Sequence, residues 1–347
     1  MRDRVRDRRD SGVARRKDSV TAIASTAHER PTLTPPTADQ FERVSCYLCG
    51  AADSSPFITA EDDLTGKPGR FTFVTCVRCG LCYQNPRLTV EHIKSYYDDE
   101  YIAHRKKTDW GPLTGFFNWA MDRHDRQKDK IVSRYVRLDD ESEVLDVGCA
   151  VGTFLQKMRA RYGARATGVD FKDLSASPML DGVEFRCGLF YEQDFRGKRF
   201  DLVTMWHFLE HDYDPMRTLA TARDLLKPDG RLIIEVPRLD STTFRVYRDR
   251  WPGLQAPQHT VLYDRTTFLL AMDKAGLDVV EYLPYGAFPA FFYFFAGAAF
   301  KVLRGKGLNL SRAIYPYFLG QILFSPVLAF EKQLNFAMQT VVCRKRT

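Results

Sequence analysis

The chain has 347 residues, which is too long for one small domain and enough for two compact units with appendages. Hydrophobic residues make up 44% of it and charged residues 27%, a balance that excludes a fibrous or wholly disordered protein. The 51 basic and 44 acidic residues leave a net charge of +7, and residues 285–347, with eight basic residues against Glu331, carry all of it. An excess confined to one segment weakens the argument from net charge for nucleic-acid binding and favours an anionic surface near that segment.

Residues 1–40 alternate Arg with Asp and then become rich in Ser, Thr and Pro, which predicts a disordered tail. This stretch lacks the apolar core segment of a signal peptide. Its aspartates are also atypical of an organelle transit sequence, which avoids acidic residues. We therefore expect a cytoplasmic, reducing location, where clustered cysteines are metal ligands before they are disulfides.

Residues 41–90 contain two Cys-x-x-Cys-Gly turns. Each turn can place two thiolates on one metal ion, and the glycine permits the tight backbone turn beneath the sulfurs. The pattern predicts a closed, structural zinc ribbon with the ligands Cys46, Cys49, Cys76 and Cys79. Unmetallated or redox thiols are the alternative, and Cys82 is a rival ligand, although it fits better as core filler.

Residues 91–140 show helical spacing from Thr89 to His104 and from Phe116 to Val136, which predicts a helical linker or cap. From residue 141 onward, apolar runs alternate with helical patterns such as Pro215–Leu226. The predicted strands are "EVLDVG", "ATGVD", "VEFRC", "FDLVTMW", "RLIIEVP", "GLDVVEYLP" and "FAMQTVVCRKR". This order predicts an α/β domain over residues 141–284 and 335–347 with a doubly wound, mostly parallel sheet.

A nucleotide-type turn follows the first of these strands. Asp146 ends the strand, Gly148 and Gly152 flank the turn, and a helix begins at Thr153, so that backbone amides can approach a ligand closely. The second strand ends at Asp170, where a carboxylate can accept both hydroxyls of a ribose. Asp170 could instead cap a following helix.

At these residues the chain resembles the class I S-adenosylmethionine-dependent methyltransferases, from about Glu143 to Pro284 and again in the last strand. "FDLVTMWHFLEH" and "LLKPDGRLIIEVP" match the family's fourth and fifth strands, whereas Ala150 departs from its glycine loop. "CGLCYQNPR" and "APQHTVLYDRTTF" are similar to bacterial members of the subgroup related to ubiquinone O-methyltransferases. The resemblance implies a seven-stranded Rossmann-like sheet and S-adenosylmethionine as cofactor. The expected cofactor-binding residues are Asp146, Gly148, Cys149, Gly152, Asp170, Leu189 and His207, with Phe190 as the alternative to Leu189 beside the adenine.

Histidines are the candidate catalytic groups, because the protein has to position the acceptor and remove or shield its proton. His211 follows the fourth strand, at the edge where open α/β sheets bind ligands, and His259 lies in a loop after the fifth strand. Each could equally be a structural histidine. Glu210 and His211 could also hold a divalent metal ion, but two ligands do not define a metal site.

Residues 285–334 form an apolar insert before the last strand. Tyr282–Phe300 and Ala313–Phe330 contain no charged residue and are at the margin of the length that spans a bilayer, about 20 residues. Prolines interrupt both runs, and a spanning hairpin would carry four cations across the membrane, so we expect helices on an anionic membrane surface, such as the inner membrane face. A substrate lid or a dimer face is the alternative.

The sequence predicts a methyltransferase that acts on a small-molecule, glycan-linked or lipid-linked acceptor, and it does not name that acceptor. A nicotinamide-dependent dehydrogenase is disfavoured because the Gly-x-Gly pattern is missing. The second alternative is a zinc-ribbon nucleic-acid adaptor with a degenerate enzyme domain. It is disfavoured because Glu61, Asp62 and Asp63 lie in the ribbon's own loop, and no nucleic-acid partner is expected.

Overall fold

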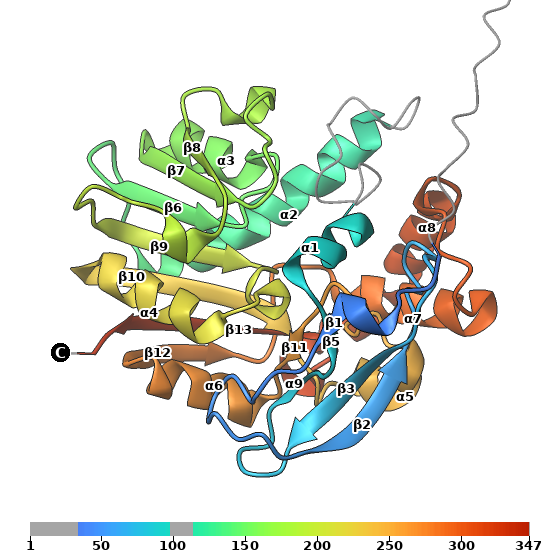
Figure 1. Ribbon diagram of the computed structural model, residues 1–347. Helices are drawn as coiled ribbons and strands as arrows, with labels where there is room; N and C mark the ends of the chain where they lie inside the picture. The colour runs from blue at the N-terminus through green and yellow to red at the C-terminus, as the bar shows by residue number, and fades with distance from the viewer. Residues whose placement is uncertain (1–33, 98–113, 347) are drawn as a thin grey trace, which may run out of the picture. The chain divides into compact units, whose positions relative to one another are not determined.

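The computed structural model describes residues 34–97 and 114–346 (Figure 1). Most of the predicted tail, residues 1–33, and the second half of the predicted helix Thr89–His104 lie outside these residues. The helices are α1 (Val90–Ile93), α2 (Thr114–Tyr135), α3 (Thr153–Tyr162), α4 (Pro215–Leu225), α5 (Thr242–Tyr247), α6 (Arg265–Lys274), α7 (Ala290–Leu303), α8 (Leu310–Leu328) and α9 (Glu331–Leu334). The strands that precede α2 are β1 (Phe41–Glu42), β2 (Ser54–Ala60), β3 (Phe71–Cys76), β4 (Cys82–Gln84) and β5 (Arg87–Leu88).

A seven-stranded sheet forms the centre of the α/β part. Its strands are β6 (Glu143–Val147), β7 (Arg165–Asp170), β8 (Glu184–Cys187), β9 (Phe200–Trp206), β10 (Leu226–Pro237), β12 (Leu277–Leu283) and β13 (Met338–Lys345). Their order is β12-β13-β10-β9-β6-β7-β8, and β13 runs antiparallel to both of its neighbours. All seven strands were predicted, and the α/β fold class with a Rossmann-like methyltransferase sheet is confirmed.

Helices cover both faces of this sheet, as alternation along its strands requires. Val144, Leu202 and Ile233 pack in one core with residues of α2 and α3. Their strand neighbours Leu145 and Leu232 point to the opposite face, where they join residues of α4 and α6 in a second core. Because both faces are covered, ligands can reach the parallel strands only at their ends.

The cysteine-rich region folds into a second sheet in the order β11-β4-β3-β2. Its edge strand β11 (Val261–Leu262) comes from the later part of the chain and pairs with Cys82 and Tyr83 of β4. A third core packs this sheet against α5 and α7. The ribbon predicted over residues 41–90 therefore includes a strand from beyond that range, and the described residues from Thr34 onward form one compact unit.

The predicted insert is helical and connects β12 to β13. It consists of α7, α8 and α9, and α7 contacts α8 side by side (Figure 1). Phe291 and Phe294 of α7 meet Phe324 of α8 with ring centroids 5.7 and 5.2 Å apart. Among the helices that the structure describes, none has both the length and the apolarity needed to cross a bilayer.

Candidate functional site

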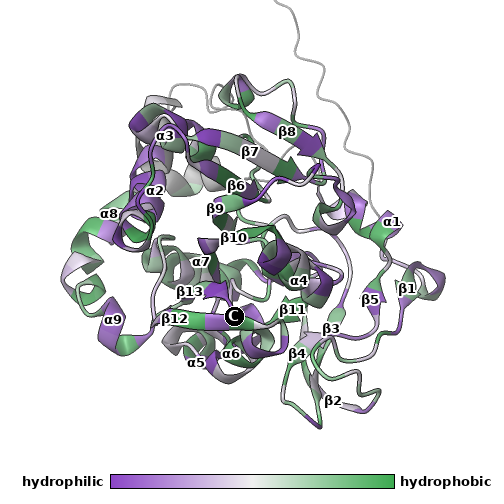
Figure 2. Ribbon diagram, turned by 90° about the vertical axis from the view of Figure 1, so that its left-hand side faces the viewer, coloured by the Kyte–Doolittle hydropathy of each residue, from purple (hydrophilic) through white to green (hydrophobic). Residues whose placement is uncertain are grey.

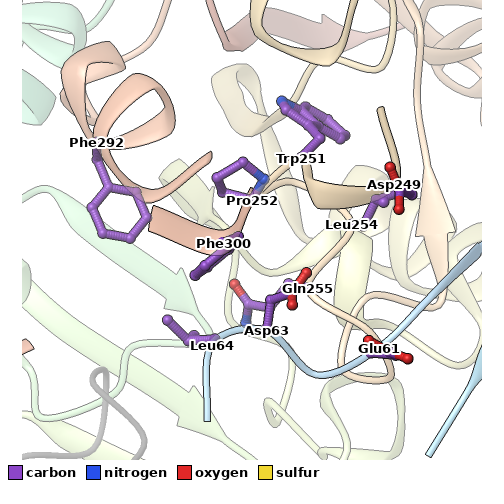
Figure 3. Close-up of a pocket in the computed structure, with 10 residues that line it drawn as sticks. All are labelled: Glu61, Asp63, Leu64, Asp249, Trp251, Pro252, Leu254, Gln255, Phe292 and Phe300. Atoms are coloured by element: carbon purple, nitrogen blue, oxygen red, sulfur yellow. The ribbon is translucent and has the colours of Figure 1, made fainter. Parts of the chain in front are cut away.

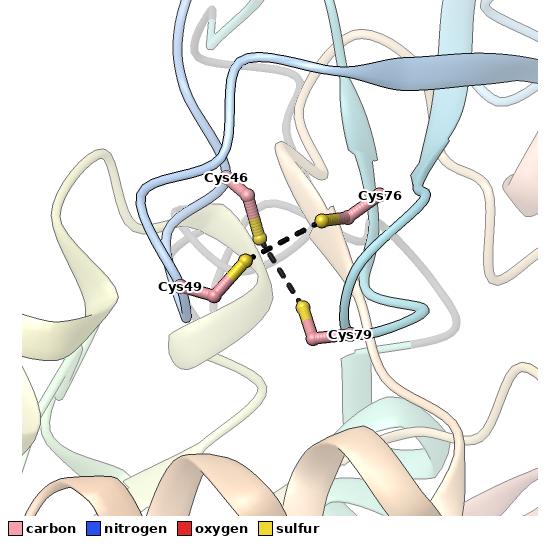
Figure 4. A group of neighbouring side chains, drawn as sticks. All are labelled: Cys46, Cys49, Cys76 and Cys79. Atoms are coloured by element: carbon pink, nitrogen blue, oxygen red, sulfur yellow. Dashed lines mark hydrogen bonds between the residues drawn. The ribbon is translucent and has the colours of Figure 1, made fainter.

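Four cysteine side chains converge at the predicted ribbon site (Figure 4). The Sγ atoms of Cys46 and Cys79 are 3.4 Å apart, and those of Cys49 and Cys76 are 3.5 Å apart. All four sulfurs lie within 4.8 Å of one another. A tetrahedral zinc ion with Zn–S bonds of about 2.3 Å sets its sulfurs about 3.8 Å apart, so this donor set fits zinc. Cys82, the rival ligand, is buried in the core instead.

Glycines shape each cysteine turn as the sequence predicts. Gly50 and Gly80 have φ angles of +68° and +79°, a region that other residues rarely adopt. Their amides donate to the carbonyl oxygens of Cys46 and Cys76 at 2.8 and 3.0 Å and close the turns. The two turns are therefore formed by the backbone itself, with the thiols directed inward.

The predicted nucleotide turn connects β6 to α3. Gly148, Ala150 and Gly152 all have positive φ, at +74°, +48° and +88°. A Cβ atom on Gly148 would lie 2.7 Å from the ring of Phe208, and one on Gly152 would lie 2.5 Å from Leu180. The turn is consequently a close-packed one in which neighbouring side chains already occupy the space that a larger residue would need.

Two buried carboxylates flank this turn. Asp170 accepts hydrogen bonds from the amides of Ala150 and Lys172 at 3.0 and 3.1 Å, and burial raises its pKa. No helix begins directly after Asp170, so the helix-cap alternative does not hold. Asp146 accepts from the Thr204 hydroxyl at 2.6 Å, and burial raises its pKa to about 7. Each carboxylate oxygen of Asp170 has a second lone pair, which suits the predicted ribose contact.

The remaining predicted cofactor contacts differ in their exposure. Cys149 points into the core near Gly168, so it offers the cofactor its backbone and not its thiol. Phe190 is buried in the core beside Phe195, whereas Leu189 is half-buried at the end of β8. Of the two adenine candidates, Leu189 alone keeps an accessible side chain.

His207 follows β9 with a φ of +56°, an unusual conformation for a residue other than glycine. Its Nε2 lies 3.1 Å from Oε1 of Glu235, and its Nδ1 lies 3.8 Å from Oε1 of Glu210. Glu210 is buried, and neither of its carboxylate oxygens has a hydrogen-bond partner among the described residues. Burial raises its pKa to about 8, so the carboxyl group is mostly protonated at neutral pH.

The two predicted catalytic histidines lie together. The rings of His211 and His259 are 4.4 Å apart and nearly perpendicular. Nδ1 of His259 donates to the carbonyl oxygen of Gly253 at 2.8 Å, and burial lowers its pKa to about 3, so this ring is neutral with Nε2 as the acceptor. Nδ1 of His211 donates to the carbonyl oxygen of Gln258 at 3.1 Å and lies 2.8 Å from the hydroxyl of Tyr97.

The structure adds three residues to this site that the sequence analysis missed. Tyr97 contacts His211 from beyond α1, and Glu235 lies in the fully buried middle of the sheet. His124 of α2 lies beside His207, with ring centroids 6.2 Å apart. A glutamate within the apolar run "LIIEVP" was the one available signal, because a charged residue in a central strand needs a specific partner.

Two further groups of side chains could hold a metal ion. Glu210, His211 and His259 form one, and His124, His207 and Glu235 form the other, with ligand atoms in each group within 4.8 Å of one another. Glu235 is already committed, however, because it accepts from the amides of Ala287 and Phe288 at 2.6 and 3.0 Å.

A small cavity lies between the ribbon and the chain that leads to His259 (Figure 3). Arg250 pairs with two of the residues that line this cavity, with Glu61 at 3.0 Å and with Asp63 at 2.7 Å. The cavity is lined by Glu61, Asp63, Leu64, Asp249, Trp251, Pro252, Leu254, Gln255, Phe292 and Phe300. No residue of the glycine turn lines this cavity, so it is distinct from the predicted cofactor site.

Three features together define a class of enzyme: the order of the strands, the glycine turn and the two carboxylates at the strand ends. Comparison with known proteins identifies the same class. Residues 120–282 match the family described as "Methyltransferase domain". These residues therefore form a methyltransferase domain, and the predicted resemblance to the class I S-adenosylmethionine-dependent methyltransferases is confirmed for them.

Its curated relatives include two ubiquinone biosynthesis O-methyltransferases. The protein of Coxiella burnetii is 33% identical over 96 residues, which are 26% of this chain and 41% of that protein. The protein of Cereibacter sphaeroides is 29% identical over 153 residues, or 40% of this chain and 61% of that protein. The chain thus spans about half the length of these relatives. A similar solved structure is phosphoethanolamine N-methyltransferase 2 of Haemonchus contortus in complex with S-adenosyl-L-methionine, with a TM-score of 0.43 and 18% identity over 64% of this chain and 53% of that one.

Proposed function

We propose that this protein transfers a methyl group from S-adenosylmethionine to a small-molecule, glycan-linked or lipid-linked acceptor bound beside His211 and His259. The observation that carries the proposal is the convergence of Glu210, His211 and His259 after β9, a strand that pairs with β6, whose own end leads into the glycine turn. When bound, the cofactor supplies an electrophilic methyl group, so the protein's task is to orient the acceptor and manage its proton.

The proposed roles follow from hydrogen bonds. Because the Gln258 carbonyl fixes the proton of His211 on Nδ1, its Nε2 is the nitrogen that can take a proton from the acceptor. His259 has a pKa of about 3, so it is a weak base, and we assign it the role of orienting the acceptor through Nε2. Protonated Glu210 can donate a hydrogen bond to the same acceptor.

We also propose that Cys46, Cys49, Cys76 and Cys79 hold one zinc ion. Four protein ligands close the tetrahedral shell, so the ion would stabilise the fold and take no part in methyl transfer. Its effect would extend to the acceptor site, because β3 and β4 follow one another across the cysteine turn and β4 pairs with β11.

Calorimetry with S-adenosylmethionine tests the cofactor site. Asp170→Ala should weaken binding by about tenfold to a hundredfold, the expected loss for a charged hydrogen-bond acceptor. Asp173→Ala is the matched control, because this exposed acid makes only a local turn contact with Ser175 and should leave the affinity unchanged. Wild-type protein that binds NADH and not S-adenosylmethionine would refute the proposal.

The acceptor can be sought with methyl-labelled S-adenosylmethionine and fractionated cell extracts. We expect label in one aqueous or lipid fraction with the wild-type protein and a loss of at least about a hundredfold with His211→Ala, in line with removal of a general base. The same variant should bind the cofactor normally. Equal labelling by the variant would exclude His211 as the base.

A further inference from the structure

Helix α8 is apolar on two opposite faces. Its inner face packs on α7, where Tyr317 lies 5.5 Å from both Phe291 and Phe295. Gly320 belongs to the same face, because a Cβ atom there would lie 2.6 Å from the ring of Phe291. A helix that is apolar all round is normally buried all round, so the outer face of α8 calls for a covering surface.

The outer face presents a continuous stripe of large side chains. Most of α8 falls in the apolar colours of Figure 2. The stripe residues follow each other at intervals of three and four, with one step of a single residue, and are 39–73% exposed; all lie on α8 except the last, which directly precedes α9. We call these residues the α8 stripe: Tyr315, Leu319, Ile322, Leu323, Val327 and Phe330. Scattered exposed apolar residues are ordinary, but such an aligned set marks an interaction surface.

Cations lie at both ends of the α8 stripe. Exposed Arg304 and Lys306 lie in the chain that leads into α8, and exposed Lys332 follows the stripe in α9. Glu331, the sole acid of residues 285–347, is half-buried, and burial raises its pKa to about 8, so it contributes little negative charge at neutral pH. Asp63, in the loop of the ribbon, accepts a hydrogen bond from the amide of Gly305, which lies between the first two of these cations. Asp63 also pairs with Arg250.

We propose that the α8 stripe docks on an anionic lipid surface, with its side chains at the acyl boundary and the cations at its ends among the headgroups. A stripe of apolar side chains with cations beside it is the arrangement of an interfacial helix. A second copy of the chain fits less well, because a twofold interface would bring the same cations face to face.

This surface is connected to the candidate site by aromatic contacts. The ring centroid of Phe288 lies 4.9 Å from that of His207 and 5.4 Å from that of Phe292. The ring centroid of Phe292 in turn lies 6.4 Å from that of Tyr317 of α8. If the proposed methyl transfer holds, these contacts connect the α8 stripe to an apolar wall of the acceptor site, which suits an acceptor with a lipid tail. The docking itself does not depend on that function.

Vesicle flotation of the full chain tests the docking. We expect the protein to float with phosphatidylglycerol-containing vesicles, to float poorly with pure phosphatidylcholine, and to be released by salt. A triple variant, Leu319→Ser with Ile322→Ser and Leu323→Ser, should bind about tenfold more weakly or worse. Arg304→Gln with Lys306→Gln should weaken binding by roughly twenty-fivefold, or about fivefold for each cation.

Matched controls make the outcome decisive. Val77→Ser with Val279→Ser and Val280→Ser changes three exposed valines outside the insert and should leave flotation unchanged. A chain that begins at Thr34 should also float, which separates the stripe from the arginines of residues 1–33. Calorimetry with S-adenosylmethionine verifies that each variant is folded, independently of vesicle binding.

Three results would overturn the proposal. The first is wild-type protein that stays at the bottom of the gradient with anionic vesicles. The second is a triple variant that floats as well as the wild type. The third is sedimentation showing a wild-type dimer that the triple variant dissociates, which would assign the stripe to contact between copies.

Discussion

Gln84 ties the ribbon to the loop that carries His259, and replacing it provides a direct test of that link. The side chain is fully buried in β4, and its Nε2 donates to the carbonyl oxygens of Pro257 and His259. Its Oε1 has no partner among the residues that the structure describes. Gln84→Met keeps the approximate volume and removes both donated bonds without removing a satisfied acceptor.

The expected cost follows from the two carbonyls. Each loses a buried hydrogen bond with a net value of about 1 kcal/mol, so the loop should lose about 2 kcal/mol. That loss corresponds to roughly thirtyfold more frequent local opening. The amide of Thr260, which donates to the backbone carbonyl oxygen of Glu210, should therefore exchange its hydrogen about thirtyfold faster.

Hydrogen exchange over residues 255–262 is the assay, with cofactor calorimetry beside it. S-adenosylmethionine affinity should hardly change, because Gln84 does not touch the glycine turn or Asp170. Gln156→Met is the control, since its amide donates to a single carbonyl at an exposed site on α3, and it should leave the loop's exchange rates as they are. If Gln84→Met lowers global stability while hydrogen exchange over residues 255–262 stays at the wild-type rate, Gln84 does not hold this loop to the ribbon.

Two further predictions concern a buried acid and the zinc ligands. Because burial raises the pKa of Glu210 from 4.5 to about 8, the folded chain keeps a proton that the unfolded chain releases, and wild-type stability should fall as the pH rises from about 5 to 8. Glu210→Gln should therefore equal the wild type at pH 5 and exceed it by up to about 4 kcal/mol at pH 8.5 in urea unfolding, and identical pH profiles would contradict this. Cys76→Ser should reduce the zinc content from one ion per chain to none and increase hydrogen exchange both in residues 41–90 and in residues 255–262. A wild-type protein purified without chelator that contains no zinc, or a variant that retains it, would count against the proposed site.

Local patterns accounted for most of the fold. The strands around "VLDVG" and "FDLVTMW" form where their apolar runs lie, because a sheet covered on both faces needs nearly continuous hydrophobic residues. The Cys-x-x-Cys-Gly turns and the glycine turn were predictable for a related reason. Their conformations depend on residues that are neighbours in sequence.

Contacts between distant segments were not predictable. The pairing of Val261 and Leu262 with β4 involves two residues with no periodic signal, and it was found only in the structure. Likewise, nothing in the sequence places Tyr97 or His124 near the histidines of the sheet edge. Such approaches are set by how helices and loops pack, so a single sequence shows the chemical groups without showing which of them meet.

Glu235 explains why the insert and the candidate site belong to one structural unit. Burial would raise the pKa of this carboxylate, but His207 and the amides of Ala287 and Phe288 hold it below its ordinary value, so it remains ionised. One buried charge thus lies 3.1 Å from Nε2 of the ring at the end of β9 and also accepts hydrogen bonds from the first residues of the insert. Removing either partner would leave a buried charge with too few donors, which is costly in a low-dielectric core. The position of α7 is therefore fixed by the same carboxylate that orients His207, and a surface bound by the insert would be held at a defined place relative to the site.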